Sequence, residues 1–171
     1  MALIIAVADP NAADVRAVLE RHLAFAREVT PPGHVHALDT GAWSDPDLTF
    51  FGARRDGSLL GVGAIRRLDA AHAELKSMHT RAEARGQGVG RAMLDHLLRV
   101  AETGGYRRVS LETGTSDAFA AARSLYLRAG FRPCAPFGQY TVNPHSVCMT
   151  LTLAGPGAGP GAGAGPGADR V

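Results

Sequence analysis

The stretch RAEARGQGVGRAM, residues 81–93, decides how this chain folds. Gly86, Gly88 and Gly90 stand directly before a segment whose apolar residues recur at helical spacing. Glycine inside a helix costs conformational entropy, so this run is typical of a sharp connection or of a backbone that an anion approaches closely. The pattern predicts a strand that ends near residue 80, a glycine-rich turn, and a helix from about 88 to 103.

Strand and helix patterns on both sides of this turn predict a mixed sheet. Residues 48–68 have the pattern of a hairpin around the turn Asp56-Gly57, and residues 73–80 add a third strand. A buried strand follows at 107–113, and the strand–helix–strand connection makes it parallel to 73–80. The other expected elements are a strand at 3–8, a helix capped by Asp9 or Asn11, a helix at 116–130, and strands at 131–137 and 145–153.

The predicted fold class is therefore α+β, with a mostly antiparallel central sheet, one parallel β-α-β crossover and helices on both faces. Of the 171 residues, 46% are apolar, which is enough for one core, and residues 1–153 form one domain. Residues 154–168 contain only Ala, Gly and Pro and cannot bury enough apolar area to offset ordering. We therefore expect residues 154–171 to be a disordered C-terminal tail.

Charge and cysteine content argue against several kinds of partner. The formal net charge is +2 with interspersed signs, which disfavours nucleic acid and membrane surfaces. The N-terminus lacks the features of a signal peptide, and Cys134 and Cys148 lack metal-type spacing. We expect a cytoplasmic monomer or homodimer with free thiols and no metal, since His34 and His36 alone are weak signs of zinc.

A helix that begins in a glycine-rich turn is suited to binding an anion. Its first N–H groups lack partners within the helix, and the helix dipole adds about half a positive charge there. Arg85 and Arg91 add fixed charges on either side of the glycines. The spacing fits neither the dinucleotide pattern nor the P-loop pattern, which disfavours an ordinary nucleotide fold. A tight turn without a ligand is the alternative interpretation.

In its context, this segment resembles the GNAT family of N-acetyltransferases. The run from Arg85 to Gly90 is similar to the family signature R/Q-x-x-G-x-G/A, and Leu125-Tyr126…Gly130-Phe131 is similar to a second signature. The resemblance covers about residues 3–153 and implies binding of acetyl-CoA as co-substrate. It implies that backbone groups near Met78 and His79 hold the pantetheine arm, along an edge opened by a splay or bulge. It implies that the pyrophosphate is bound by Arg85, Gly86, Gln87, Gly88, Val89, Gly90 and Arg91.

The resemblance also implies transfer of the acetyl group to a primary amine, by direct attack through a tetrahedral intermediate. Tyr126 matches the tyrosine that the family often uses to protonate the leaving thiolate, although a packing role is the other interpretation. Glu74 lies fourteen residues before Gly88, the place of a general base in histone-acetylating members. Lys76 on the same strand face would lower the pKa of Glu74 and weaken it as a base. Glu112 on the facing strand and a water relay are the alternatives.

The identity of the acceptor amine is the part of the function that the sequence indicates least. We expect the acceptor pocket between residues 25–43 and the loop 137–145, with Tyr140 as a lining residue. The near-neutral charge favours a small molecule over an extended charged partner. The competing function is a non-catalytic acyl-CoA-binding sensor or accessory subunit, and such a protein would not need Tyr126.

Overall fold

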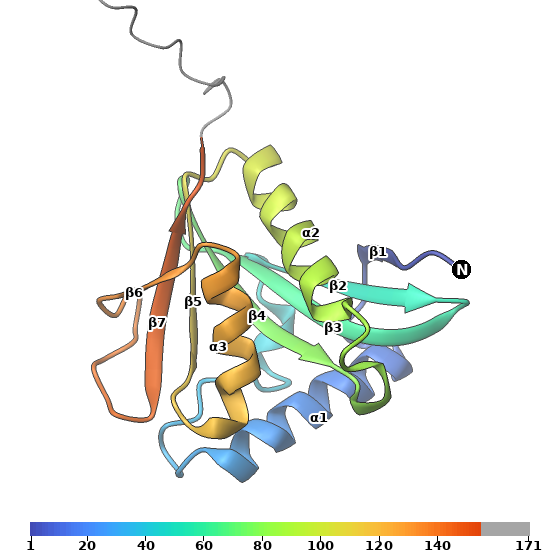
Figure 1. Ribbon diagram of the computed structural model, residues 1–171, viewed down its shortest axis with the longest axis horizontal. Helices are drawn as coiled ribbons and strands as arrows, with labels where there is room; N and C mark the ends of the chain where they lie inside the picture. Colours follow the sequence, from blue (N-terminus) through green and yellow to red (C-terminus); the bar gives the residue numbers. More distant parts are fainter. Residues whose placement is uncertain (155–171) are drawn as a thin grey trace, which may run out of the picture.

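The computed structural model describes residues 1–154, and the expected tail lies, apart from its first residue, outside the described residues. The strands of this part form one sheet in the order β1-β2-β3-β4-β5-β7-β6 (Figure 1). Neighbouring strands are antiparallel except β4 and β5, which are parallel. The predicted mixed sheet with one parallel crossover is therefore confirmed. The strands are β1 (Ile4–Val7), β2 (Leu48–Arg55), β3 (Ser58–Arg67), β4 (His72–Thr80), β5 (Arg108–Gly114), β6 (Arg132–Cys134) and β7 (Ser146–Thr152).

Helices cover both faces of the sheet (Figure 1). Successive residues of β2 point to opposite faces, so Phe50 packs in one core cluster with Leu19, and Phe51 packs in the other with Met93. None of the helices in residues 1–154 is long and apolar enough to span a membrane. The α-helices are α1 (Ala13–Val29), α2 (Val89–Thr103) and α3 (Ala120–Arg128), and the 3₁₀ turns are η1 (Ala42–Ser44), η2 (Ala82–Ala84) and η3 (Asp117–Phe119).

Glycines fix the turns where the sequence predicts them. The hairpin between β2 and β3 turns at Asp56 and Gly57, whose φ angles of 51° and 80° fit a type I′ turn. Gly105 and Gly130, each the second residue after its helix, α2 and α3, have φ of 80° and 102°. Both glycines therefore end their helices in the left-handed conformation that favours this residue.

Two predicted boundaries are wrong. The N-cap of α1 is Ala12, because the Asp9 carboxylate instead accepts the amide of Asn11 at 2.9 Å and shapes the preceding turn. β6 ends at Cys134 rather than at residue 137. Pro136 lies just beyond that end and has no N–H for a sheet ladder, which favours the early end of the strand.

β4 and β5 pair only at their first residues and then separate (Figure 1). Their ladder joins His72–Glu74 to Arg108–Ser110, whereas β4 continues to Thr80 and β5 to Gly114. β4 also bulges at Ser77, which has a φ of 52°. The expected splay and bulge are thus both present, and within residues 1–154 the facing edges of the two strands have no sheet partner beyond the ladder.

Candidate active site

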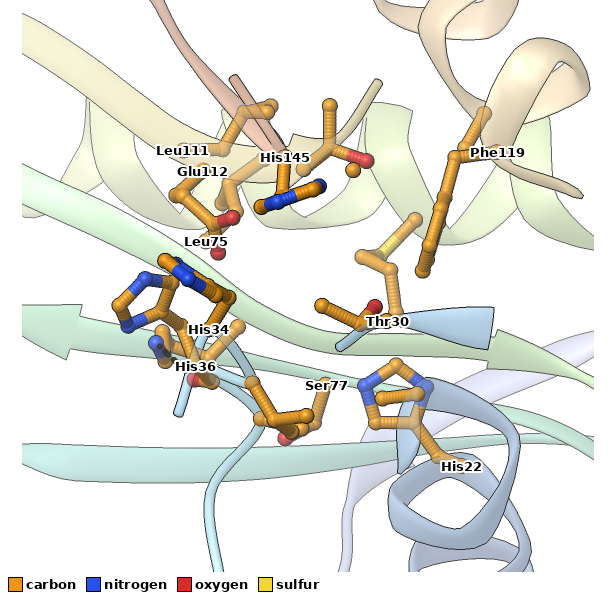
Figure 2. A pocket seen from close by; sticks show the side chains of 18 of the residues that line it. His22, Thr30, His34, His36, Leu75, Ser77, Leu111, Glu112, Phe119 and His145 are labelled. Atoms are coloured by element: carbon orange, nitrogen blue, oxygen red, sulfur yellow. Dashed lines mark hydrogen bonds between the residues drawn. The ribbon is translucent and has the colours of Figure 1, made fainter. Parts of the chain in front are cut away.

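Two adjoining hollows lie where β4 and β5 separate. The glycine-loop cleft, about 460 Å³ in volume, lies between the end of β4, the start of α2 and α3. The splay cavity, about 100 Å³, lies between β4, β5 and the loops before β2 and β7 (Figure 2). The hollows share five lining residues: His22, Met78, Phe119, Ala122 and Tyr126.

The start of α2 presents backbone amides at the glycine-loop cleft. Gly88 is the N-cap with φ of 79°, and Gly86 has φ of 73°, so the turn itself requires both glycines. Within residues 1–154 no hydrogen bond uses the amides from Gln87 to Arg91, and no side chain caps the helix. Unpaired amides at a helix start form an anion site. The residues predicted to bind the cofactor all line this cleft except Gln87.

Gly90 differs from the other two glycines. Its φ is not positive, and a Cβ there would meet only Thr80 Oγ1 at 3.5 Å and Leu125 Cδ2 at 3.7 Å, which is ordinary van der Waals contact. Thr80 and Leu125 both line the cleft, so a methyl group at this position would stand in the cleft. The turn therefore accounts for Gly86 and Gly88, whereas neither φ nor a close contact requires a glycine at position 90.

The polar side chains around the glycines have different tasks. The Gln87 side chain fixes the loop by donating to the Glu83 carbonyl oxygen at 2.8 Å. Arg91 forms an ion pair with Asp95, one helical turn later, at 2.9 Å. Arg85 forms no ion pair within the described residues and lines the cleft. Arg85 is therefore the cation best placed to meet an anion at this helix start.

Tyr126 lies on α3 where the two hollows meet. Only 6% of it is exposed, and its ring packs edge-on against Phe131 with centroids 5.9 Å apart. Burial raises the pKa of the phenol, and the charge of Glu112 raises it further, so the hydroxyl keeps its proton at neutral pH. Tyr126 thus packs the core with its ring and supplies a protonated hydroxyl at the hollows.

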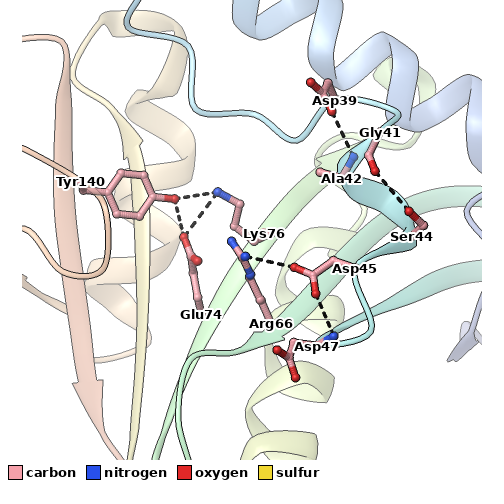
Figure 3. A network of polar contacts seen from close by, with 10 residues as sticks. All are labelled: Asp39, Gly41, Ala42, Ser44, Asp45, Asp47, Arg66, Glu74, Lys76 and Tyr140. Atoms are coloured by element: carbon pink, nitrogen blue, oxygen red, sulfur yellow. Dashed lines mark hydrogen bonds and ion pairs between the residues drawn. The ribbon is translucent and has the colours of Figure 1, made fainter.

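The structure separates the two candidate carboxylates. Glu112 lines the splay cavity, and burial raises its pKa to about 7, against the lowering effects of Lys76 and Ser146. A carboxyl group that titrates near neutral pH is suited to accept a proton there. Glu74 is only 2% exposed and does not line the cavity. Its carboxylate accepts a hydrogen bond from Tyr140 and pairs with Lys76 at 3.4 Å (Figure 3).

Three histidines from two loops gather around the splay cavity (Figure 2). His34 and His36 follow α1, His145 precedes β7, and the rings of His34 and His145 lie 4.7 Å apart. Residues 1–154 contain no group of three or more His, Cys, Asp or Glu side chains placed to hold a metal ion. The three imidazoles form part of the polar wall of the cavity.

His22 was not among the site residues predicted from the sequence. This α1 residue lines both hollows, and within the described residues its Nδ1 is buried without a hydrogen-bond partner. Burial lowers its pKa to about 4, with His79 and Lys76 adding to the effect, so the ring is neutral at pH 7. A signal was present, because Val18, His22 and Ala26 share one helix face and the two outer residues are buried. A polar residue within an apolar stripe indicates a functional position.

A sheet split between two parallel strands, with a helix start full of free amides beside the split, defines an acyl-CoA N-acyltransferase fold. Sequence comparison gives the family. The model of the acetyltransferase (GNAT) family matches residues 15–131, and this chain belongs to that family. The uncharacterized N-acetyltransferase YsnE of Bacillus subtilis is 39% identical over 149 residues, 87% of this chain and 99% of YsnE. The uncharacterized N-acetyltransferase YedL of Escherichia coli is 40% identical over 139 residues, 81% of this chain and 87% of YedL.

Solved structures of the same fold agree with this family. A candidate acyl-CoA N-acyltransferase from Klebsiella pneumoniae superposes with a TM-score of 0.73 at 25% identity, covering 89% of this chain and 98% of its own. A GNAT family acetyltransferase from Elizabethkingia anophelis, solved with acetyl-CoA bound, has a TM-score of 0.67 at 14% identity and covers 88% of this chain and 98% of its own. Another protein with this fold thus binds acetyl-CoA.

Proposed function

We propose that this protein transfers the acetyl group of acetyl-CoA to the primary amine of a small molecule. The observation that carries the proposal is the position of Tyr126, between a cleft lined by free amides and a cavity that holds Glu112. One hollow suits an anionic donor, and the other suits an amine that must lose a proton. The tyrosine has the protonated hydroxyl that the leaving group needs.

In this proposal the donor lies along the glycine-loop cleft. The pyrophosphate accepts hydrogen bonds from the amides between Gln87 and Arg91, and Arg85 contributes a charge. The pantetheine arm lies beside Met78 and His79, where β4 has no sheet partner on its β5 side. Its amides then pair with β4 as a neighbouring strand would.

The acceptor amine enters the splay cavity as an ammonium ion and gives a proton to Glu112. The neutral nitrogen attacks the thioester carbon, and a backbone N–H of β4 stabilises the oxyanion of the tetrahedral intermediate. The intermediate collapses, the C–S bond breaks, and Tyr126 protonates the thiolate. The nitrogen loses its second proton to solvent, Tyr126 regains a proton from solvent, and Glu112 releases the proton it accepted to solvent, which restores both residues for the next turnover. We assign the role of general base to Glu112 rather than to Glu74, because Glu112 lines the cavity and Glu74 does not.

The test measures thiol release from acetyl-CoA with a panel of small primary amines, together with the mass of each product. Tyr126→Phe is expected to lower kcat by about 100-fold and to leave the Kd of acetyl-CoA unchanged. Tyr106→Phe is the matched control, since Tyr106 packs against the core and lines neither hollow. Binding of acetyl-CoA without turnover on any amine would reject the enzyme and favour an acyl-CoA-binding sensor or accessory subunit.

A further inference from the structure

The proposed reaction leaves unused a buried polar triad beside the splay cavity (Figure 3). It consists of Glu74 and Lys76 on β4 and Tyr140 on the loop before β7. Lys76 Nζ lies 3.4 Å from Glu74 Oε1, 2.6 Å from Tyr140 Oη and 3.2 Å from the carbonyl oxygen of His36. Only 3% of the Glu74 side chain and 10% of the Lys76 side chain are exposed. The ammonium group thus donates two hydrogen bonds, to the His36 carbonyl and the Tyr140 hydroxyl, and forms an ion pair with Glu74.

The triad joins three segments that are far apart in the sequence. β4 supplies the ion pair, the loop 30–41 supplies the His36 carbonyl, and the loop 135–145 supplies Tyr140. The His36 ring also packs edge-on against Tyr140, with centroids 5.2 Å apart. Both loops contribute to the wall of the splay cavity, through His34, Val35, His36, Ala37 and His145. The triad therefore holds that wall on β4.

The ion pair of the triad also sets the charge near Glu112. Lys76 lines the cavity, and its positive charge lowers the pKa of Glu112, whereas the negative charge of Glu74 raises it. The two effects oppose each other, so Glu74 offsets part of the effect of the Lys76 charge on Glu112. Other titratable groups face Glu112 from every surrounding element, namely His22 of α1, His34 and His36 of the loop 30–41, Tyr126 of α3, Tyr140 and His145 of the loop 135–145, and Cys148 of β7.

We propose that Glu74, Lys76 and Tyr140 are positioning residues, which fix the two acceptor loops and cancel the Lys76 charge so that a cationic amine can enter. The inference rests on the proposed function for the use of the cavity as the acceptor site. An ammonium ion without Glu74 beside it would repel a positively charged acceptor and would change the titration of Glu112. The triad thus specifies a small amine that arrives protonated.

The electrostatic part is tested by a ¹³C NMR titration of the Glu112 side-chain carboxyl in the full chain, without acetyl-CoA or acceptor. Glu74→Gln is expected to move the Glu112 midpoint to lower pH by about one pH unit, and Lys76→Met to move it higher by a similar amount. The double variant removes both charges, so its midpoint returns close to that of the wild type. Glu112→Gln identifies the signal by its loss.

The positioning part is tested with Tyr140→Phe, which removes a hydroxyl but no charge. Amides of the loops 30–41 and 135–145 are expected to exchange with deuterium about tenfold faster, and the Glu112 midpoint stays in place. With an amine found in the panel, the acceptor KM rises about tenfold and the acetyl-CoA KM is unchanged. Asp45→Asn is the control, because it breaks a more exposed ion pair with Arg66, at 3.0 Å, that does not touch the triad.

Each outcome decides one part of the inference. Midpoints that stay in place, or that move in the same direction in Glu74→Gln and Lys76→Met, would overturn the electrostatic role. Unchanged loop exchange and acceptor KM in Tyr140→Phe would overturn the positioning role. If one single charge variant does not fold, the midpoint of the other still decides the electrostatic role, and Tyr140→Phe decides the positioning role. Failure of every amine would reject the proposed function alone, since the NMR and exchange measurements need no turnover.

Discussion

Among the three glycines before and within the start of α2, Gly90 is the one whose substitution can test ligand binding without disturbing the turn. Gly86 and Gly88 have positive φ, so a larger residue there strains the backbone and disturbs fold and ligand binding together. Gly90 has no such constraint, and its missing Cβ would meet only ordinary contacts. A substitution at this glycine can therefore separate the two effects.

We expect Gly90→Ala to raise the KM of acetyl-CoA about tenfold, which corresponds to about 1.4 kcal/mol of binding. The melting temperature should not fall, because alanine stabilises a helix by about 0.5–1 kcal/mol over glycine. Steady-state kinetics and a thermal melt measure the two quantities. Gly41→Ala, outside both hollows, serves as the control and should leave the KM unchanged. A lower melting temperature with an unchanged KM would mean that Gly90 serves the turn alone.

Glu112 is expected to give the reaction its pH dependence. Only the ionised carboxyl accepts a proton, and burial raises its pKa to about 7 in the free protein, so kcat/KM should rise with pH to a plateau, with a midpoint near 7. Glu112→Gln should lower kcat about 100-fold and remove this rise. The control is Glu102→Gln, on the exposed side of α2. A rise that persists in Glu112→Gln would assign the base to a water relay or another group.

At the scale of single elements, α1 carries a polar side chain at a core position that borders both hollows. His22 interrupts the apolar stripe of the helix, and its buried Nδ1 has no partner in the described residues. An unpaired buried polar atom costs about 1–3 kcal/mol of stability. The imidazole reaches both hollows, where a bound ligand can supply the missing hydrogen bond.

We therefore expect His22→Leu to raise the melting temperature and to lower the rate of acetylation about tenfold. A higher melting temperature together with a lower rate is expected for a residue that contributes to the reaction at the expense of stability. Thermal melts and initial rates measure them, with Leu23→Ala as the contrasting variant, since loss of a buried apolar side chain lowers stability. A His22→Leu protein that is less stable would show that the histidine is part of the packing.

The elements that were predicted correctly are those whose signals are local. The Asp56-Gly57 turn, the glycine run and the strand–helix–strand crossover each occupy a short stretch, and each formed where expected. The triad could not be predicted from local patterns, because Tyr140 lies 64 residues from Lys76 in the sequence. The conformation of the loop before β7 brings the two side chains into contact. The sequence did place Glu74 and Lys76 on one strand face. It could not show that a tyrosine would complete the pair, or that Glu112 would face the cavity instead.

For the whole molecule, buried histidines make stability depend on pH. Burial lowers the pKa of His22 and of His79 to about 4, below the ordinary value of 6.5. Between pH 4 and pH 6.5 these two histidines bind protons in the unfolded chain but not in the folded chain. The free energy of unfolding is therefore highest above pH 6.5 and falls as the pH drops toward 4. The loss is on the order of 1 kcal/mol per pH unit for each group.

We expect the melting temperature to fall between pH 7 and pH 5, and His22→Leu to make that fall smaller. Thermal melts at constant ionic strength measure the difference between the two proteins. His96→Leu gives a comparison at a histidine outside both hollows. An equal fall in wild type and His22→Leu would mean that His22 titrates alike in the folded and unfolded chains.

The short ladder between β4 and β5 has a consequence for the cohesion of the molecule. Three residue pairs are all that join the parallel strands, so the sheet consists of two panels with a seam between them. A ligand in that seam touches both panels, and at a hundred times its Kd it adds about 2.7 kcal/mol to the stability of the folded state. Release of the product removes this stabilisation from the folded state. The gap that we propose admits the substrates is thus also a place where a bound ligand joins the two halves of the sheet.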